Sequence, residues 1–179
     1  PDLICFAKGV NSGYVPLGGV VISAAIAATF EQRAFPGGLT YSGHPLACAS
    51  AVASIRIFEE EGILENVRKV SDTVLAPRLA EITAKHPSVG EVRGLGFFWG
   101  LELVRNPETR EPLVPFNASG AAAGPMNEFA AACKAEGLWP FVHFNRTHVV
   151  PPCTTTAEEM TEGLDILDRA LEVADRFTA

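Results

Sequence analysis

The pattern of apolar residues changes at Gly62, and this change constrains the fold more than any other feature of the chain. Before it, short apolar runs such as residues 3–7 are typical of buried strands. After it, residues 63–86 place apolar side chains three and four positions apart, which is the period of an amphipathic helix. The sequence therefore predicts two domains of different architecture, residues 1–62 and residues 63–179.

The first domain is predicted to contain buried strands of the parallel type, followed by helices. The runs at residues 3–7 and 17–22 lack polar alternation, as strands that are buried on both faces do. Ser23 is placed to cap a short helix over residues 24–30. A polar loop then leads into an Ala-rich helix over residues 46–61, which Gly62 should end.

The second domain is predicted to be α+β. Its expected elements are a helix over 63–86, two strands within 89–104, a helix over 126–136, strands within 138–150 and a helix from 156 to 177. Pro77 should break or kink the first helix because proline lacks the N–H that a helix interior needs. Thr156 and Glu159 form a capping box at the start of the last helix. The aromatic residues Trp139, Phe141 and Phe144 are expected in the core.

Charge and cysteine content limit the classes of partner. The formal charge is −7, from 14 basic and 21 acidic residues, which argues against nucleic acid or an anionic membrane surface. No apolar run approaches the length of a membrane span. The four cysteines form no CxxC pair, so we expect reduced thiols, a cytoplasmic location, and neither a disulfide framework nor a metal site.

Lys8 is the first candidate for chemistry. It follows an apolar strand and precedes Gly9, and lysine is rarely buried unless it is paired or used. Loss of solvation near apolar walls would disfavour the ammonium form and leave a free amine to attack a carbonyl. The alternative is an ordinary lysine at a strand end whose amine reaches water.

Two further places could bind an anion. Residues 39–45, with Thr40 and Ser42, precede a helix, and hydroxyl groups beside a helix N-terminus favour negative charge. Arg146 and His148 lie two apart in a predicted strand, so they share a face and could hold a carboxylate or sulfonate. A capped polar loop and a solvated strand edge are the alternative interpretations.

Several motifs, taken in order, resemble the class III pyridoxal-phosphate-dependent aminotransferases. These are Ala7-Lys8-Gly9, Pro16-Leu17-Gly18, Thr40-Tyr41-Ser42-Gly43-His44-Pro45-Leu46-Ala47, Glu59-Glu60-Glu61-Gly62, Val92-Arg93-Gly94-Leu95-Gly96 and Pro151-Pro152. The resemblance runs along the whole chain. It implies an α/β fold, namely the C-terminal part of a fold type I transferase that contains the end of the large domain and the whole small domain.

The resemblance also implies a cofactor, a set of roles and an assembly. Pyridoxal 5′-phosphate would bond to Lys8, which would also move the substrate proton, and Thr40 would bind the cofactor phosphate of the neighbouring subunit. The intact protein would then be a homodimer or homotetramer. Family members are more than twice as long, so the chain is expected to be a fragment that lacks upstream cofactor contacts and is inactive alone.

The expected reaction moves an amino group from an ω-amine or amino acid to a keto acid such as pyruvate. Many family members have an arginine three residues before the double proline, where this chain has His148, so Arg146 could substitute for it. Residues 137–152 are similar to the taurine–pyruvate aminotransferase branch, which makes taurine or a β-amino acid a candidate donor. The alternatives are an aminomutase, a decarboxylating transaminase, or a truncated non-catalytic chain that pairs with another polypeptide.

Overall fold

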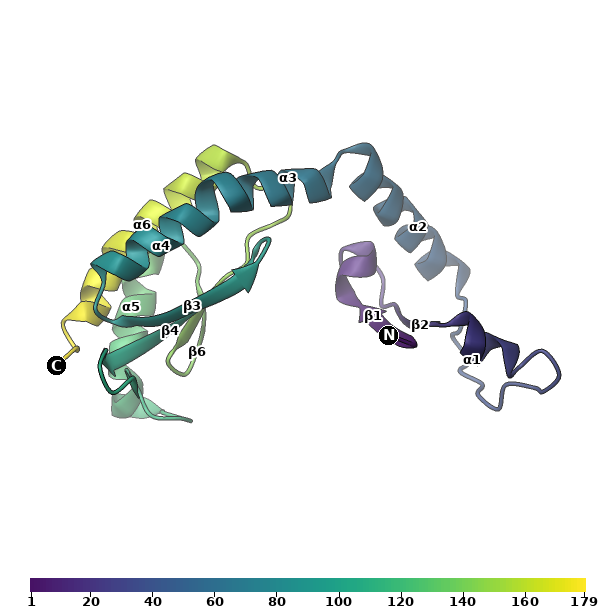
Figure 1. Cartoon of the computed structure of the whole chain (residues 1–179), viewed down its shortest axis with the longest axis horizontal. Helices are drawn as coiled ribbons and strands as arrows, with labels where there is room; N and C mark the ends of the chain where they lie inside the picture. Colours follow the sequence, from purple (N-terminus) through teal and green to yellow (C-terminus); the bar gives the residue numbers. More distant parts are fainter. The chain divides into compact units, whose positions relative to one another are not determined.

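A computed structural model describes residues 1–179, the whole chain (Figure 1). The chain divides into two compact units, Pro1–Ile63 and Leu64–Ala179. None of its helices combines the length and the apolar character that a bilayer crossing requires. The division between the units falls at the start of helix α3 (Ile63–Val70).

The two strands of the first unit differ from the prediction in direction and in burial. Strands β1 (Leu3–Ala7) and β2 (Gly18–Ile22) are antiparallel, with Leu3 opposite Ile22. Only residues 8–17 separate them, and a parallel pair needs a crossover of about a dozen residues or more. The strands are also largely exposed, because no other layer of this unit covers the two-stranded sheet.

The two helices of the first unit lie close to the predicted ranges. Helix α1 (Ala24–Ala28) is capped by Ser23, whose hydroxyl accepts a hydrogen bond from the Ile26 N–H at 3.4 Å. Helix α2 (Pro45–Glu60) is followed by Gly62, which has a φ of 60°. This left-handed conformation costs glycine little and ends a helix, as expected from the sequence.

The second unit begins with a helix that changes its hydrogen-bonding pattern midway. Helix α3 leads into a single π turn, η2 (Ser71–Leu75), and then into helix α4 (Ala76–Lys85). Pro77 lies in the first turn of α4, directly after the π turn. The predicted irregularity at Pro77 therefore takes the form of one wide turn rather than a complete break, and the helix ends before His86 and Pro87 as expected.

An antiparallel sheet forms the other layer of this unit, in the strand order β3-β4-β7-β6, with β5 paired to β4. Its strands are β3 (Val89–Leu95), β4 (Phe98–Asn106), β5 (Glu111–Pro112), β6 (Phe141–His143) and β7 (Arg146–Val149). The remaining elements are η3 (Gly120–Ala123), α5 (Gly124–Ala135) and α6 (Ala157–Asp175). These elements agree with the predicted α+β succession.

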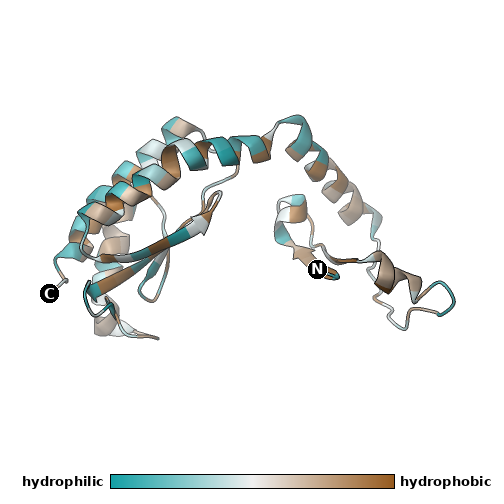
Figure 2. Cartoon of the chain, in the orientation of Figure 1, coloured by the Kyte–Doolittle hydropathy of each residue, from teal (hydrophilic) through white to brown (hydrophobic).

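The core of the second unit lies between the helices and one face of the sheet. Helices α4 and α6 lie side by side along the sheet, and α5 packs against α6 (Figure 1). Both α4 and α6 alternate hydrophilic and hydrophobic residues, as amphipathic helices do (Figure 2). Fully buried core side chains include Leu75, Leu79, Ile82, Leu101, Leu103, Leu113, Phe129, Leu164 and Leu171.

The three aromatic residues expected in the core lie outside it, and that prediction was wrong. Trp139 and Phe141 are 81% and 59% exposed. Phe144 is half-buried, with its ring centroid 4.7 Å from that of Phe116, itself exposed. Strand β6 ends the strand order, so neighbours cover only one of its sides.

Candidate functional site

Lys8 lies where β1 ends and the 3₁₀ helix η1 (Lys8–Asn11) begins. Its backbone has a φ of 52°, which is uncommon for residues other than glycine. The side chain is exposed, so this chain alone does not supply the apolar walls expected around it. All ion pairs of the chain join residues between Arg78 and Asp175, which leaves the Lys8 amine without a carboxylate partner.

Asn11 organises the loop after Lys8 and was not singled out from the sequence. Its side chain is 1% exposed, and its Nδ2 donates a hydrogen bond to the Val15 carbonyl at 2.6 Å. The neighbouring Ser12 hydroxyl lies 3.3 Å from the Ser54 hydroxyl of α2. The run Asn-Ser-Gly indicates an ordinary turn, and nothing in it shows that the asparagine is buried.

Thr40 begins a turn that leads into α2. The Ser42 N–H donates to the Leu39 carbonyl at 2.9 Å, and the His44 N–H donates to the Tyr41 carbonyl at 3.3 Å. His44 is the N-cap residue of α2, and its side chain makes no capping hydrogen bond. The first turn of this 16-residue helix therefore has no side-chain cap and follows two hydroxyl groups in sequence, an arrangement suited to an anion.

Arg146 and His148 lie on the same face of β7, as their spacing predicts. Both line a shallow depression of the sheet together with Arg93 and Glu102. Glu102 lies opposite Arg146 in the register, but its carboxylate accepts a hydrogen bond from Arg93 at 2.5 Å. The side-chain contact of Arg146 is instead with His143 Nδ1, at 3.3 Å.

The two residues differ in charge. Burial, and then the positive charges of Arg146 and His143, lower the pKa of His148 below its ordinary 6.5. The imidazole lies among aromatic rings, with its centroid 4.9 Å from that of Phe141 and 5.8 Å from that of Phe98. His148 is therefore neutral at pH 7, and Arg146 is the fixed cation of the pair.

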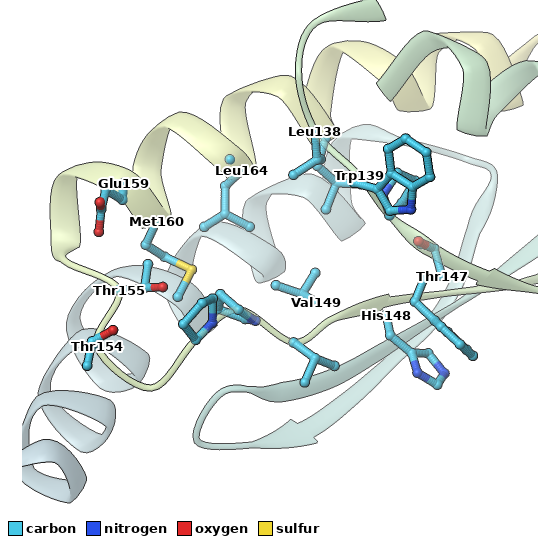
Figure 3. Close-up of a pocket in the computed structure, with 17 residues that line it drawn as sticks. Leu138, Trp139, Thr147, His148, Val149, Thr154, Thr155, Glu159, Met160 and Leu164 are labelled. Carbon is cyan, nitrogen blue, oxygen red and sulfur yellow. The ribbon is translucent and has the colours of Figure 1, made fainter. Parts of the chain in front are cut away.

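A pocket of about 470 Å³ opens in the second unit beside β7 (Figure 3). Its walls are mainly apolar and include Leu138, Met160 and Leu164, while His148 lies at one end of it. Glu159 also lines the pocket, and its carboxylate accepts the Thr156 N–H of the capping box at 2.8 Å. The pocket can accept an apolar group, and it brings no nucleophile or cation pair together.

A separate cluster of charged groups joins the end of α4 to α6. His86 is 2% exposed, with Nδ1 2.6 Å from an Asp175 oxygen and Nε2 2.6 Å from an Asp168 oxygen. Lys85 and Arg78 also donate to Asp168, at 2.6 and 2.8 Å. Burial opposes the ionisation of Asp168, but the hydrogen bonds from Lys85 and His86 outweigh it and lower its pKa to about 2. This cluster holds two elements together within the second unit.

The predicted site residues fall into both units. Lys8 and Thr40 belong to the first unit, and Arg146 and His148 belong to the second. Within the first unit, the structure provides an exposed lysine without an ion-pair partner and an uncapped helix start preceded by hydroxyl groups. Within the second, it provides a cation and a neutral imidazole on one strand face.

Solved structures of aminotransferases are similar to the whole chain. A taurine:2-oxoglutarate aminotransferase from Bifidobacterium kashiwanohense, in complex with PLP and glutamate, is 39% identical with a TM-score of 0.89. The match covers 98% of this chain and 39% of that one. An (S)-enantioselective omega-transaminase from Thermomicrobium roseum is 34% identical, with a TM-score of 0.80 and coverage of 96% and 37%.

Relatives of known activity include two further transaminases. Putrescine–pyruvate aminotransferase of Pseudomonas aeruginosa is 49% identical over 112 residues, which are 62% of this chain and 24% of that protein. Gamma aminobutyrate transaminase 2 of Solanum lycopersicum is 33% identical over 183 residues, which are 98% of this chain and 38% of that protein. The chain thus spans less than two fifths of the length of either relative.

The family of this chain is shown by a match that extends over almost all of its residues. Residues 1–171 fit the family model described as aminotransferase class-III. The enzymes of this family depend on pyridoxal phosphate, the group present in the Bifidobacterium structure. The chain therefore belongs to the class-III aminotransferases.

Proposed function

We propose that this chain is the C-terminal part of a pyridoxal-phosphate-dependent aminotransferase in which Lys8 bonds the cofactor. The unit Pro1–Ile63 is then the end of the large cofactor-binding domain, and Leu64–Ala179 is the small domain. The enzyme moves an amino group from an ω-amine or amino acid to a keto acid such as pyruvate.

The observation that carries this proposal is the side chain of Lys8, which lies at the end of β1 and has no ion-pair partner. A primary amine attacks an aldehyde carbon with its nitrogen lone pair, and Lys8 has no carboxylate partner that would hold it in the charged form without that lone pair. Its left-handed backbone also fits a residue that the surrounding structure holds in one orientation. Lys8 lies inside the Ala7-Lys8-Gly9 motif, where the family has its cofactor lysine.

The first unit has residues suited to an aldehyde and, separately, to a phosphate. Lys8 suits the aldehyde of this subunit's cofactor, while the Thr40 and Ser42 hydroxyls and the uncapped start of α2 suit the phosphate of the neighbouring subunit's cofactor. Bound pyridoxal phosphate supplies an electron sink next to the substrate carbon that loses a proton. Lys8 Nζ, when it is not bonded to that group, would take up the proton as a general base.

The proposed site is shared between subunits, with Thr40 serving the neighbouring subunit's cofactor. A homodimer is then the smallest active assembly, and a homotetramer would satisfy the same requirement. Support for Thr40 as a ligand of the neighbouring subunit's cofactor comes from the Thr40-Tyr41-Ser42-Gly43-His44 motif rather than from a contact within one chain. The cytoplasmic location expected from the four free cysteines stays a prediction.

For the substrate, we propose a small acid with a distal amine, such as taurine or a β-amino acid. Arg146 supplies a fixed positive charge on the exposed face of β7, and His148 lies beside it. The relatives described above are named for taurine, putrescine and gamma-aminobutyrate, and each of these compounds has an amine at a chain end. Two of the three also have an acid group at the other end, which an arginine can bind.

Amino transfer is favoured over the alternative reactions. The four relatives described above are named as aminotransferases or transaminases, and none as an aminomutase or a decarboxylase. The lysine, the hydroxyl turn and the uncapped helix start occur together in the first unit, which favours a catalytic chain over a non-catalytic one.

The test is covalent attachment of cofactor to Lys8 in the full-length protein. We expect Lys8→Ala to lose the visible absorbance band of bound cofactor and to lose the label that borohydride fixes to the peptide containing Lys8. Lys69→Ala, which removes an exposed lysine of α3, is the matched control and should retain both. A Lys8→Ala protein that still fixes cofactor to its chain would refute the proposal.

A further inference from the structure

Asn11 is the one buried polar side chain of the first unit. It is 1% exposed, whereas Lys8, three residues earlier, is exposed. Burial of an amide is unfavourable unless its polar atoms are hydrogen bonded. The hydrogen bond from Asn11 Nδ2 to the Val15 carbonyl, at 2.6 Å, meets that need and joins the two ends of the loop.

The segment around Asn11 rests on one face of α2. Ala47, Ala51 and Ser54 lie four and three residues apart on this face, and the two alanines are buried. The 3₁₀ helix η1 packs against α2, and the Ser12 hydroxyl lies 3.3 Å from that of Ser54. The chain directly after Lys8 is therefore held against a long helix through Ser12, while the adjacent Asn11 closes the loop by its hydrogen bond to Val15.

The backbone of the same segment is left-handed at two non-glycine residues. Lys8 has a φ of 52° and Ser12 a φ of 54°. Such conformations persist only when surrounding contacts hold them in place. Two backbone hydrogen bonds close the turn, from Ser12 N–H to the Gly9 carbonyl and from Tyr14 N–H to the Asn11 carbonyl, at 3.3 and 3.1 Å.

We propose that Asn11 is a positioning residue that holds Lys8 in its left-handed conformation and so directs its amine toward the cofactor aldehyde. The inference rests on the proposed function, because it takes Lys8 as the residue that bonds the cofactor. Asn11 itself touches neither cofactor nor substrate in this role. It acts through the Val15 carbonyl and through the turn that ends at Ser12.

Without the Asn11 side chain, Lys8 is free to adopt the extended conformation that other residues prefer. Only the fraction of molecules with the correct conformation then binds cofactor, and the apparent dissociation constant rises by the inverse of that fraction. We expect the apparent affinity for pyridoxal phosphate to fall about 10-fold, which corresponds to 1.4 kcal/mol. The rate at which the visible absorbance band forms should fall by a similar factor.

The experiment uses the full-length protein and two substitutions. Asn11→Ala removes both the bulk and the donor, and Asn11→Leu keeps apolar bulk without the donor. Asn127→Ala is the matched control, because Asn127 is an exposed asparagine of helix α5 in the second unit, where alanine fits the backbone. Pyridoxal phosphate is titrated into each apo-protein, and the visible band, its dependence on pH and the melting temperature are recorded.

We expect both Asn11 variants to stay folded, to bind cofactor about 10-fold more weakly and to change the pH dependence of the band. Asn127→Ala should behave as the wild-type protein. An apparent affinity for pyridoxal phosphate within twofold of wild type, together with an unchanged pH dependence of the band, would overturn the proposal. A loss of affinity that accompanies an equal loss of folded protein would also overturn the proposal, because it would show that Asn11 has a purely structural role. If borohydride labels a residue other than Lys8 in the wild-type protein, the proposed function itself fails, and this outcome is distinct from the others.

Discussion

Arg146 and His148 share one strand face but not one charge state. Burial and the neighbouring positive charges lower the pKa of His148, so it is neutral at pH 7 and gains a charge only in acid. Arg146 contributes a guanidinium group, which proteins keep protonated. An acidic donor held on this face should therefore depend on Arg146 at all pH values and on His148 only at low pH.

We expect Arg146→Ala to lower kcat/KM for an acidic donor such as taurine about 10-fold at pH 8, since one charge-assisted contact of 1.4 kcal/mol corresponds to one decade. Putrescine, which has no acid group, serves as the control donor and should change less than twofold. His148→Gln should leave kcat/KM for the acidic donor unchanged at pH 8. The wild-type enzyme is expected to gain affinity for the acidic donor in acid, as His148 becomes charged below pH 6.5, and His148→Gln should abolish this gain.

Equal effects of Arg146→Ala on both donors, or no effect on either, would show that this strand face does not hold the acid group.

Helices α4 and α6 are joined by a carboxylate that accepts several hydrogen bonds. Asp168 of α6 is bound by Lys85, by Arg78 and by the buried His86 at the end of α4. Removal of one partner from such a cluster leaves a buried charge without a counter-charge. The resulting loss of unfolding free energy is larger than the contribution of a surface ion pair. This contact therefore makes α6 sensitive to pH.

The pKa of Asp168 falls from 3.8 to about 2 in the folded chain, so its contribution to stability is complete above pH 3.8 and is lost as the pH falls through about 2. A shift of this size corresponds to about 2 kcal/mol of unfolding free energy. We expect Asp168→Asn to lower the unfolding free energy by about that amount at pH 7. The difference from wild type should disappear near pH 2.

Chemical denaturation across this pH range is the measurement, and Asp72→Asn, at an exposed aspartate, is the control. A constant difference between Asp168→Asn and wild type from pH 7 to pH 2 would contradict the assignment.

Most helices could be predicted because their ends are marked by local chemistry. The capping box of Thr156 and Glu159, Ser23 before α1 and Gly62 after α2 act through neighbouring backbone groups and need no tertiary context. The direction of β1 and β2 could not be derived from their apolar runs. Such runs are typical of parallel strands, whereas the short connection decides the pairing.

The 179-residue chain is expected to be inactive when it is made alone. It spans 39% of the matched taurine aminotransferase chain, and the site proposed above would also need a second subunit. We expect the purified 179-residue chain to bind pyridoxal phosphate weakly and to show no transaminase turnover with pyruvate and an amine donor. Turnover above the rate without protein would disprove this.

Lys8 and Thr40 enter the candidate site from the sequence because both lie inside long motifs, and their roles stay predictions. Asn11 could not be predicted from the sequence, because a buried asparagine and an exposed turn asparagine have the same sequence context. His86 was missed for a related reason. Its partners Asp168 and Asp175 are more than 80 residues away, so no local pattern indicates the cluster.

The π turn between α3 and α4 has a consequence for how chain length can evolve. Buried residues Leu75, Leu79 and Ile82 follow each other at spacings of four and three, but Val70 precedes Leu75 by five. The turn thus contains one residue more than a regular α-helix would. Loss of one residue there would restore the regular spacing and leave the core contacts on either side in place.

Pro77 determines whether such a deletion is tolerated, because a proline ring inside a regular helix clashes with the carbonyl four residues earlier. Deletion of Asp72 alone should cost about 3 kcal/mol or more of unfolding free energy, and deletion combined with Pro77→Ala should cost much less. Thermal unfolding of the two variants distinguishes these cases. Among relatives, one-residue gaps in this helix should therefore occur together with the loss of the proline.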